Sequence, residues 1–209
     1  MIIENKVPIP IARFFTYLFQ PLLMPFYGTV IFLWYDDLLS LQLPIVTRLY
    51  ILGFIFLLTF LLPALAALLM KNMGVIKSLE METREERKIP LLFTAFIYTA
   101  VFFIIGQVPI LARMRVFVLA TTITVIVSGF ITNYYKISIH MTGCGGVAGL
   151  IALMASYSYH NLTWLLAAAI IVSGFVGVSR IVLKAHTNDQ VYLGFTFGFL
   201  TVFLMGLFL

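Results

Sequence analysis

The sequence predicts an all-α fold, a bundle of six or seven membrane-spanning helices. Of the 209 residues, 62% are hydrophobic and only 10% are charged, whereas a soluble domain carries about a quarter charged residues. The apolar residues form long runs, and a spanning helix needs roughly 20 such residues. Because these runs occupy most of the chain, we expect residues 1–209 to form one membrane domain without a separate soluble part.

Seven apolar runs are the candidate spans. The first contains Pro21 and Pro25, so we expect it to be kinked or only partly inserted. Pro90 suits the first turn of the third helix, and Arg113 and Arg115 are expected in a turn before the fourth. The runs cover residues 14–35, 48–70, 90–110, 116–134, 140–159, 161–179 and 189–209.

Glycine spacing predicts which helices pack most closely. Gly145 and Gly149 lie four residues apart in the fifth run, and Gly194 and Gly198 repeat this spacing in the seventh. Small residues at this spacing allow two helix backbones to approach closely in a membrane. We therefore expect the fifth and seventh helices to be in tight contact near the polar segments that precede them.

The charge distribution indicates the class of partner. The formal net charge of +5 is modest, and the basic residues lie in short segments that flank the apolar runs. This placement favours membrane lipids or a phosphate group as partners and argues against nucleic acid. We expect neither a metal nor another cofactor, because no cluster of carboxylates or histidines has a convincing ligand count.

Three polar segments are expected on one face of the membrane. Two apolar runs separate residues 71–88 from residues 135–140, and another two separate these from residues 180–189. An even number of crossings returns the chain to the same side, whatever the first run does. His160 then falls on the opposite face, where we expect it to have no chemical role.

Two histidines and several cations therefore share a face. His140 and His186 each lie where a helix is expected to begin, and helix N-termini bind anions. Histidine can act as a nucleophile or a proton donor near neutral pH. The helix N-terminus favours a neutral, nucleophilic His186, whereas an acid at His140 would need the bound phosphate to restore its proton. The cations available to a phosphoryl group are Lys77, Arg84, Arg87, Lys136, Arg180 and Lys184.

These residues resemble the motifs of type 2 phosphatidic acid phosphatases, also called lipid phosphate phosphatases. The third motif of that family, S-R-x5-H-x3-D, is matched by Ser179, Arg180 and His186. The second motif, P-S-G-H, survives in part as Ser138 and His140. The chain is therefore similar to this family at one well-matched motif and one degraded motif.

The first motif of the family, K-x6-R-P, can be aligned in two ways. Lys77 and Arg84 have the required separation, but Glu85 stands where the family has proline. Arg87 with Pro90 is the competing alignment. The sequence leaves open which of the two arginines belongs to the motif.

The resemblance implies a metal-independent lipid phosphate phosphatase with a catalytic core of about residues 77–198. By this analogy, His186 would form a phosphohistidine and His140 would protonate the leaving group. Arg180 and one arginine of the first loop would bind phosphoryl oxygens. Further candidates for phosphate binding are Ser138, Lys77, Lys136 and Lys184.

One position departs from the family pattern. The family's aspartate, which orients the nucleophilic histidine, should lie four residues after it, where this chain has Gln190. Asp189 is one residue early, but offsets of three and four both return to one helix face, so it could substitute. Gln190 could equally accept the imidazole N–H through its amide oxygen. A third interpretation makes Asp189 the N-cap of the last helix.

Two other functions remain open on the sequence alone. One is a small transporter or lipid-binding membrane protein without catalysis, and the other is a lipid phosphotransferase that uses the same histidines. Transporters place ionisable groups near the middle of the membrane. Here the ionisable groups gather at one membrane edge, which favours the enzyme.

The expected location is the plasma or bacterial inner membrane, and two arguments disagree on orientation. With seven spans, Arg48, Arg113 and Arg115 lie opposite the histidines, and the other ten of the 13 basic residues, Lys6 among them, share their face. The positive-inside rule would put that face in the cytoplasm. The family resemblance puts it outside. Because several of these bases would bind phosphate in either orientation, we expect an outward-facing site.

Overall fold

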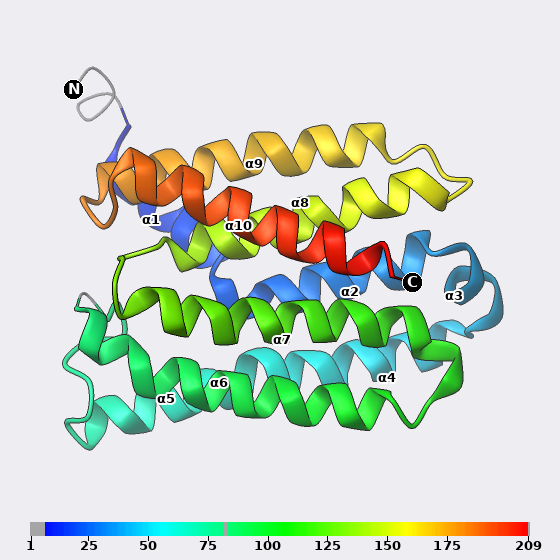
Figure 1. The fold of residues 1–209 in the computed structure, drawn as a ribbon, viewed down its shortest axis with the longest axis horizontal. Helices are drawn as coiled ribbons and strands as arrows, with labels where there is room; N and C mark the ends of the chain where they lie inside the picture. Colours follow the sequence, from blue (N-terminus) through cyan, green and yellow to red (C-terminus); the bar gives the residue numbers. More distant parts are fainter. Residues whose placement is uncertain (1–6, 82, 209) are drawn as a thin grey trace.

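The computed structural model of the protein describes residues 7–81 and 83–208, so Lys6 lies outside the described residues. It confirms the all-α prediction, since seven helical segments of the described chain are long and apolar enough to cross a membrane. These segments run side by side in one elongated bundle (Figure 1). In chain order the helices are α1 (Ile9–Leu18), η1 (Pro21–Leu23), α2 (Met24–Tyr35), α3 (Asp37–Gln42), α4 (Ile45–Ile55), η2 (Phe56–Leu61), α5 (Leu62–Asn72), α6 (Arg84–Ile105), η3 (Pro109–Leu111), α7 (Ala112–Thr132), α8 (Ile139–Tyr157), α9 (Thr163–Val182) and α10 (Asn188–Gly206).

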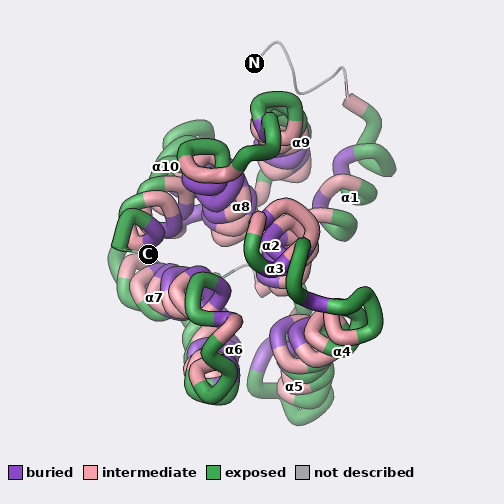
Figure 2. The backbone as a smooth tube through the Cα atoms, turned by 90° about the vertical axis from the view of Figure 1, so that its right-hand side faces the viewer, coloured by how far each residue is buried: buried purple, intermediate pink, exposed green. Residues whose placement is uncertain are grey.

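Helix α8 is the central span of the bundle. In its most apolar window 61% of the residues are buried, against at most 39% in any other span. Seen along the bundle, the buried positions of the helices face inward and the exposed positions face outward (Figure 2). The outward positions are largely apolar, because in a lipid bilayer they contact hydrocarbon and need no polar groups.

The first span is broken, as its prolines predict. Helix α1 ends at Leu18, and η1 begins at Pro21, whose ring nitrogen has no hydrogen to continue the helical ladder. The hydroxyl of Tyr27 donates a 2.8 Å hydrogen bond to the Leu18 carbonyl and so satisfies one of the acceptors that the break leaves open. The two halves of the span are therefore separate elements with separate packing.

Pro63 perturbs the span formed by α4, η2 and α5. Pro63 cannot donate a hydrogen bond to the carbonyl of Thr59, and the chain widens there into the π-helical turn η2. The buried hydroxyl of Tyr98, on α6, donates to that carbonyl at 3.2 Å. An unsatisfied carbonyl within the membrane would cost several kcal/mol. Tyr98 removes this cost and ties α6 to the second span.

Helix α6 begins six residues before the predicted start. Thr83 is its N-cap, and the Thr83 and Glu86 side chains each accept a backbone N–H at 3.4 Å from the other residue, which forms a capping box. Pro90 therefore lies inside the helix, and its predicted place in the first turn is wrong. The charged residues from Arg84 to Lys88 become part of a helix face, which gives each a fixed direction.

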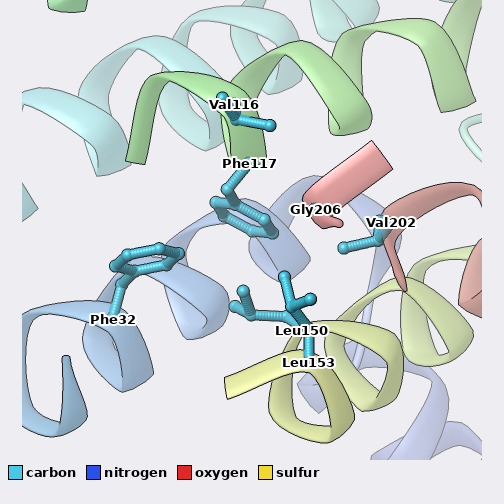
Figure 3. A pocket seen from close by; sticks show the side chains of 7 residues that line it. All are labelled: Phe32, Val116, Phe117, Leu150, Leu153, Val202 and Gly206. Carbon is cyan, nitrogen blue, oxygen red and sulfur yellow. The ribbon is translucent and has the colours of Figure 1, made fainter. Parts of the chain in front are cut away.

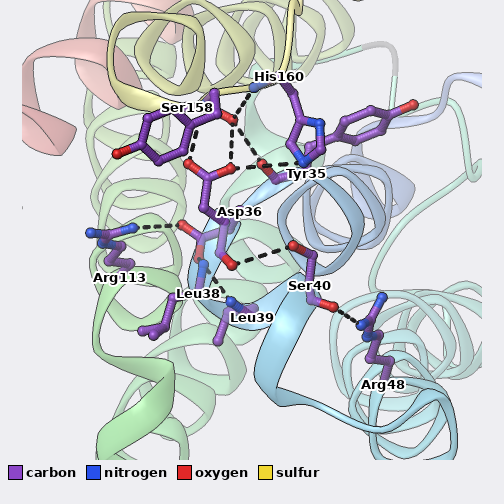
Figure 4. A network of polar contacts seen from close by, with 11 residues as sticks. Tyr35, Asp36, Leu38, Leu39, Ser40, Arg48, Arg113, Ser158 and His160 are labelled. Carbon is purple, nitrogen blue, oxygen red and sulfur yellow. Dashed lines mark hydrogen bonds and ion pairs between the residues drawn. The ribbon is translucent and has the colours of Figure 1, made fainter.

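The start of α7 also differs from the prediction. Arg113 and Arg115 lie in its first turn and not in a turn before it. Arg113 forms a 3.1 Å ion pair with Asp36, which is fully buried (Figure 4). The other carboxylate oxygen of Asp36 accepts the backbone N–H groups of Leu38 and Leu39 at 3.1 Å and caps α3. This pair clamps the end of the first span to the start of the fourth at one end of the bundle.

The close contact predicted between the fifth and seventh spans is confirmed in α8 and α10. A Cβ atom at Gly149 would lie 2.5 Å from the carbonyl oxygen of Phe199. A Cβ atom at Gly198 would come closer still to the carbonyl of Thr142, and Gly145 meets the α10 backbone in the same way. Since a Cβ atom cannot come this close to a non-bonded backbone atom, only glycine permits this separation of the two helices.

We predict that Gly198→Ala destabilises the protein by about 1–3 kcal/mol, because the added methyl group forces α8 and α10 apart. Gly174→Ala is the matched control, since a Cβ at Gly174 on α9 would have no atom within 4 Å. Thermal unfolding in detergent micelles measures both variants. Equal melting temperatures for the two alanine variants would contradict the predicted packing constraint.

Candidate functional site

The three polar connections predicted to share a face do meet at one end of the bundle. The α5–α6, α7–α8 and α9–α10 connections lie together at the left of Figure 1, beside α1. Arg87 Nη1 donates to the Ile137 carbonyl at 3.5 Å, and the Ser138 N–H donates to the Gln190 carbonyl at 3.3 Å. These contacts join the starts of α6, α8 and α10 directly.

The α9–α10 connection positions His186. Helix α9 ends at Val182, and two residues later Lys184 lies in the left-handed region, at a φ of 54°. This conformation commonly terminates helices. The N–H groups of Ala185 and His186 then return to the Arg180 carbonyl at 3.0 and 3.3 Å. This turn folds back on the end of α9 and holds His186 beneath it, with only 8% of its surface exposed.

Gln190 orients the imidazole of His186. Its side-chain oxygen lies 2.8 Å from His186 Nδ1 and also accepts the Thr187 N–H at 3.4 Å. The backbone N–H requires an acceptor, so the oxygen of the amide, and not its nitrogen, faces this side. Nδ1 of His186 must then carry the hydrogen, which leaves the lone pair on Nε2. A lone pair on Nε2 is what a nucleophilic imidazole needs.

The pKa of His186 is lowered to about 4, and burial is the largest cause. The hydrogen bond to Gln190 raises this pKa, and the positive charges of Arg87, Arg180 and Lys136 contribute to its lowering. At neutral pH the imidazole is therefore uncharged. The sequence prediction of a neutral His186 agrees with this result, and the main cause is burial.

Arg87 is a buried cation on the first turns of α6. Only 7% of its surface is exposed, and its side chain donates to the carbonyls of Met81 at 2.8 Å and Ile137 at 3.5 Å. Neither partner is charged. Among residues 7–81 and 83–208, the ion pairs involve Arg113 and His160 at the other end of the bundle. The charge of Arg87 is therefore not neutralised by a carboxylate in the described chain.

Arg180 lies in the last turn of α9, and its charge also lacks an ion-pair partner in the described part of the chain. Its Nη1 donates to the hydroxyl of Thr16 at 3.5 Å, and its buried Nε has no hydrogen-bond partner in this structure. The exposed Glu80 attracts it, but from beyond ion-pair distance. Arg87 lies close enough to repel it. Two cations held this close together form a site for an anion.

His140 and Ser138 complete the cluster from the start of α8. Ser138 is the N-cap residue, fully buried, and its hydroxyl has no hydrogen-bond partner among residues 7–81 and 83–208. His140, in the first turn, is partly exposed and lies close enough to interact electrostatically with Arg180 and Arg87, and with His186 when that imidazole is protonated. Two histidines, two arginines and an unpaired hydroxyl thus converge from α6, α8, α9 and the start of α10.

Several sequence candidates lie away from this cluster. Arg84 is exposed and donates to the carbonyls of Asn133 and Tyr134 at 3.4 and 3.2 Å, which tethers the α7–α8 connection. Lys77 is exposed beside Glu86, and Lys184 is exposed at the turn after α9. Arg87, and not Arg84, is the first-loop arginine in the cluster. Lys136 remains in it, because its charge acts on His186.

Asp189 takes neither of the roles considered for it. It is exposed, as the second residue of α10, and Thr187 is the N-cap, so the capping interpretation is wrong. His186 contacts Gln190 instead. Thr16, which accepts a hydrogen bond from Arg180, is not among the site residues that the sequence predicted. A single threonine in an apolar run carries no signal of a contact with residues far along the chain.

An apolar pocket at the opposite end of the bundle is separate from this cluster. It lies between α2, α7, α8 and α10, near the last residue of α10, whereas His186 precedes the first (Figure 3). It has no polar lining that could bind phosphate. The lining residues are Phe32, Val116, Phe117, Leu150, Leu153, Val202 and Gly206.

Comparison of the chain with protein-family models, with curated proteins and with solved structures finds no match. The argument for function therefore depends on the residues of the cluster and their geometry.

We predict that His186 reacts with diethyl pyrocarbonate down to unusually low pH. The reagent acylates only unprotonated imidazole, so the rate should fall as pH drops through about 4, where His186 gains its proton. An ordinary histidine loses reactivity near pH 6.5. Mass spectrometry of the peptide containing His186, against a histidine-containing model peptide, measures this. A midpoint near 6.5 for His186 would contradict the buried, cation-flanked geometry.

Proposed function

We propose that this chain is an integral membrane phosphatase of lipid phosphates or diphosphates, divergent from the type 2 phosphatidic acid phosphatases. One observation carries the proposal. Arg87 and Arg180, without a carboxylate partner in the described chain, lie with a neutral, oriented His186 and with His140 at one end of the bundle. This is the set of groups that phosphoryl transfer to histidine requires.

The first step of the proposed reaction forms a phosphohistidine. The lone pair on Nε2 of His186 attacks phosphorus, and the bond from phosphorus to the lipid oxygen breaks. His140, which takes its proton from the bound phosphate, passes it to that oxygen, so the lipid leaves as a neutral alcohol, or as a phosphate from a diphosphate. Arg87 and Arg180 stabilise the charge on the phosphoryl oxygens. The Ser138 hydroxyl supplies a further donor.

The second step returns the enzyme to its starting state. Water attacks the phosphorus and gives a proton to His140, and the bond from phosphorus to nitrogen breaks. His140 then returns this proton to the departing phosphate and is neutral again. The products are inorganic phosphate and neutral His186. The side-chain oxygen of Gln190 accepts the hydrogen bond from Nδ1–H of His186 throughout, so Nε2 faces the substrate in every cycle.

The position of the cluster supports a lipid as the substrate. It lies at one end of helices whose outer surfaces are apolar, where a phosphate group at the membrane surface meets arginines while its hydrocarbon stays in the bilayer. An isoprenoid diphosphate, a phosphatidylglycerol phosphate or a lipid A phosphate would all fit this arrangement. The site therefore supports the reaction class, and phosphate release from each lipid identifies the substrate.

We predict that His186→Ala and His140→Ala each lower phosphate release by several orders of magnitude, because no nearby group replaces a nucleophile or a proton donor. Inorganic phosphate released by purified protein from a panel of lipid phosphates, with EDTA present throughout, measures this. Since the proposed chemistry uses no metal, wild-type activity should survive EDTA. Full activity of His186→Ala, or activity restored only by added metal, would overturn the proposal.

The arginines provide a sharper, matched comparison. Arg87→Ala should lower kcat/KM about 10- to 100-fold, since it removes hydrogen bonds from a buried cation to the phosphoryl group. Arg84→Ala, three residues earlier on the same helix, should change it by no more than about twofold because Arg84 is exposed and bonds only a loop backbone. His160→Ala should likewise be near neutral. A larger loss of kcat/KM in Arg84→Ala than in Arg87→Ala would contradict the assignment of Arg87 to the phosphate site.

We propose further that the site faces outward from a plasma or bacterial inner membrane. The bases proposed to bind phosphate weaken the positive-inside argument, because they are needed in either orientation. In a variant with Cys144→Ala and Asn188→Cys, a membrane-impermeant thiol reagent should label the exposed residue 188 in cells whose inner membrane is intact. Labelling only after lysis of that membrane would place the site in the cytoplasm.

A further inference from the structure

Thr16 differs from the other buried threonines of the bundle. The described residues include eight threonines with less than a tenth of their surface exposed. Seven of them donate a hydrogen bond to the carbonyl four residues earlier, as threonines in membrane helices commonly do. Thr16 instead accepts one from Arg180, 164 residues away, on α9. The seven are Thr29, Thr59, Thr94, Thr122, Thr124, Thr132 and Thr142.

The backbone of the same residue interacts with the second histidine. Besides holding Arg180 through its hydroxyl at 3.5 Å, Thr16 presents its backbone to the imidazole of His140. One residue of α1 therefore contacts both a proposed phosphate-binding arginine and the proposed acid.

The break in the first span explains why this backbone group is free. The last four carbonyls of any helix lack a partner within it, and α1 ends only two residues after Thr16. In a continuous helix the Thr16 carbonyl would accept from the Gln20 N–H, but Gln20 is extended, at φ −70° and ψ 147°. The Leu18 carbonyl is satisfied by the hydroxyl of Tyr27 at 2.8 Å. The Thr16 carbonyl is left facing His140, where an imidazole N–H can use it.

Helix α1 is held against α9 by side-chain packing next to this contact. The rings of Phe15 and Phe175 stack with centroids 5.1 Å apart. Phe15 precedes Thr16, and Phe175 lies in α9 about one turn before Arg180. The position of Thr16 relative to Arg180 is therefore fixed by an aromatic contact that does not itself involve the charged cluster.

We propose that Thr16 is a positioning residue, through which the broken first span holds Arg180 and His140 in the geometry that receives a phosphoryl group. This inference rests on the proposed function. It adds α1 to a site otherwise built from the polar connections and the helices that flank them. Thr16 acts through Arg180 and His140 and is assigned no chemical step.

The test compares Thr16→Val, which removes the hydroxyl while keeping the shape of the side chain, with Thr16→Ser, which keeps the hydroxyl. Binding of inorganic phosphate, measured by its protection of His186 from diethyl pyrocarbonate, should weaken about tenfold in Thr16→Val, because a hydrogen bond to a charged group is lost. Thr16→Ser should remain within about threefold of the wild type. The matched control is Thr122→Val, since Thr122 is equally buried but bonds only its own helix.

Turnover is measured on the same variants, so that the two proposals can fail separately. If the wild type releases phosphate, a matching fall in kcat/KM for Thr16→Val, with recovery in Thr16→Ser, supports the inference. If the wild type binds inorganic phosphate but liberates none from lipid phosphates, the phosphatase proposal fails. The phosphate-binding measurements on the variants then decide alone whether Thr16 is a positioning residue. Equal phosphate binding by Thr16→Val and Thr122→Val overturns the inference. Should Thr16→Val fail to fold, Thr16→Ala replaces it, and failure to bind phosphate at all overturns both proposals.

Discussion

The close contact between α8 and α10 is the constraint on which the geometry of the candidate site depends. Glycines allow the two backbones to touch, so the residue before α8, Ser138, lies beside the first two turns of α10, next to Gln190 and Gly194. The hydrogen bond from the Ser138 N–H to the Gln190 carbonyl is the direct result. His140 follows Ser138, and His186 contacts Gln190, so this one contact brings the two histidines together. A wider separation would leave each histidine at its own helix end.

Buried charges have ion-pair partners at one end of the described bundle and lack them at the other. At the end that carries Asp36, a buried carboxylate is paired with Arg113 and capped by backbone N–H groups, which stabilises the fold (Figure 4). At the other end Arg87 and Arg180 have no such pairing in the described chain. A buried cation without a counterion is costly, so the fold tolerates these two through carbonyl and hydroxyl contacts. In the proposed mechanism the missing counterion is the substrate phosphate.

A neutral orienter is consistent with this charge balance. An aspartate beside His186 would place a negative charge next to the arginines and compete with phosphate for them. Gln190 holds the same Nδ1 hydrogen through an uncharged oxygen, so the full positive charge of the cluster remains for an anion. The cost is that the imidazolium form receives no carboxylate stabilisation, in keeping with a pKa of about 4 for His186. Such a histidine is suited to attack in the neutral form.

The sequence by itself determined the membrane class, six or seven spans, the shared face of the polar connections and the α8–α10 contact, because run length, the number of crossings and glycine spacing can be read along the chain. Only the tertiary structure decided between Arg84 and Arg87, since the choice depends on the helical phase set by the capping box at Thr83. It also selected Gln190 over Asp189 and brought Thr16 to Arg180. These outcomes depend on which side chains meet across helices, and no periodicity within a single segment records such a contact.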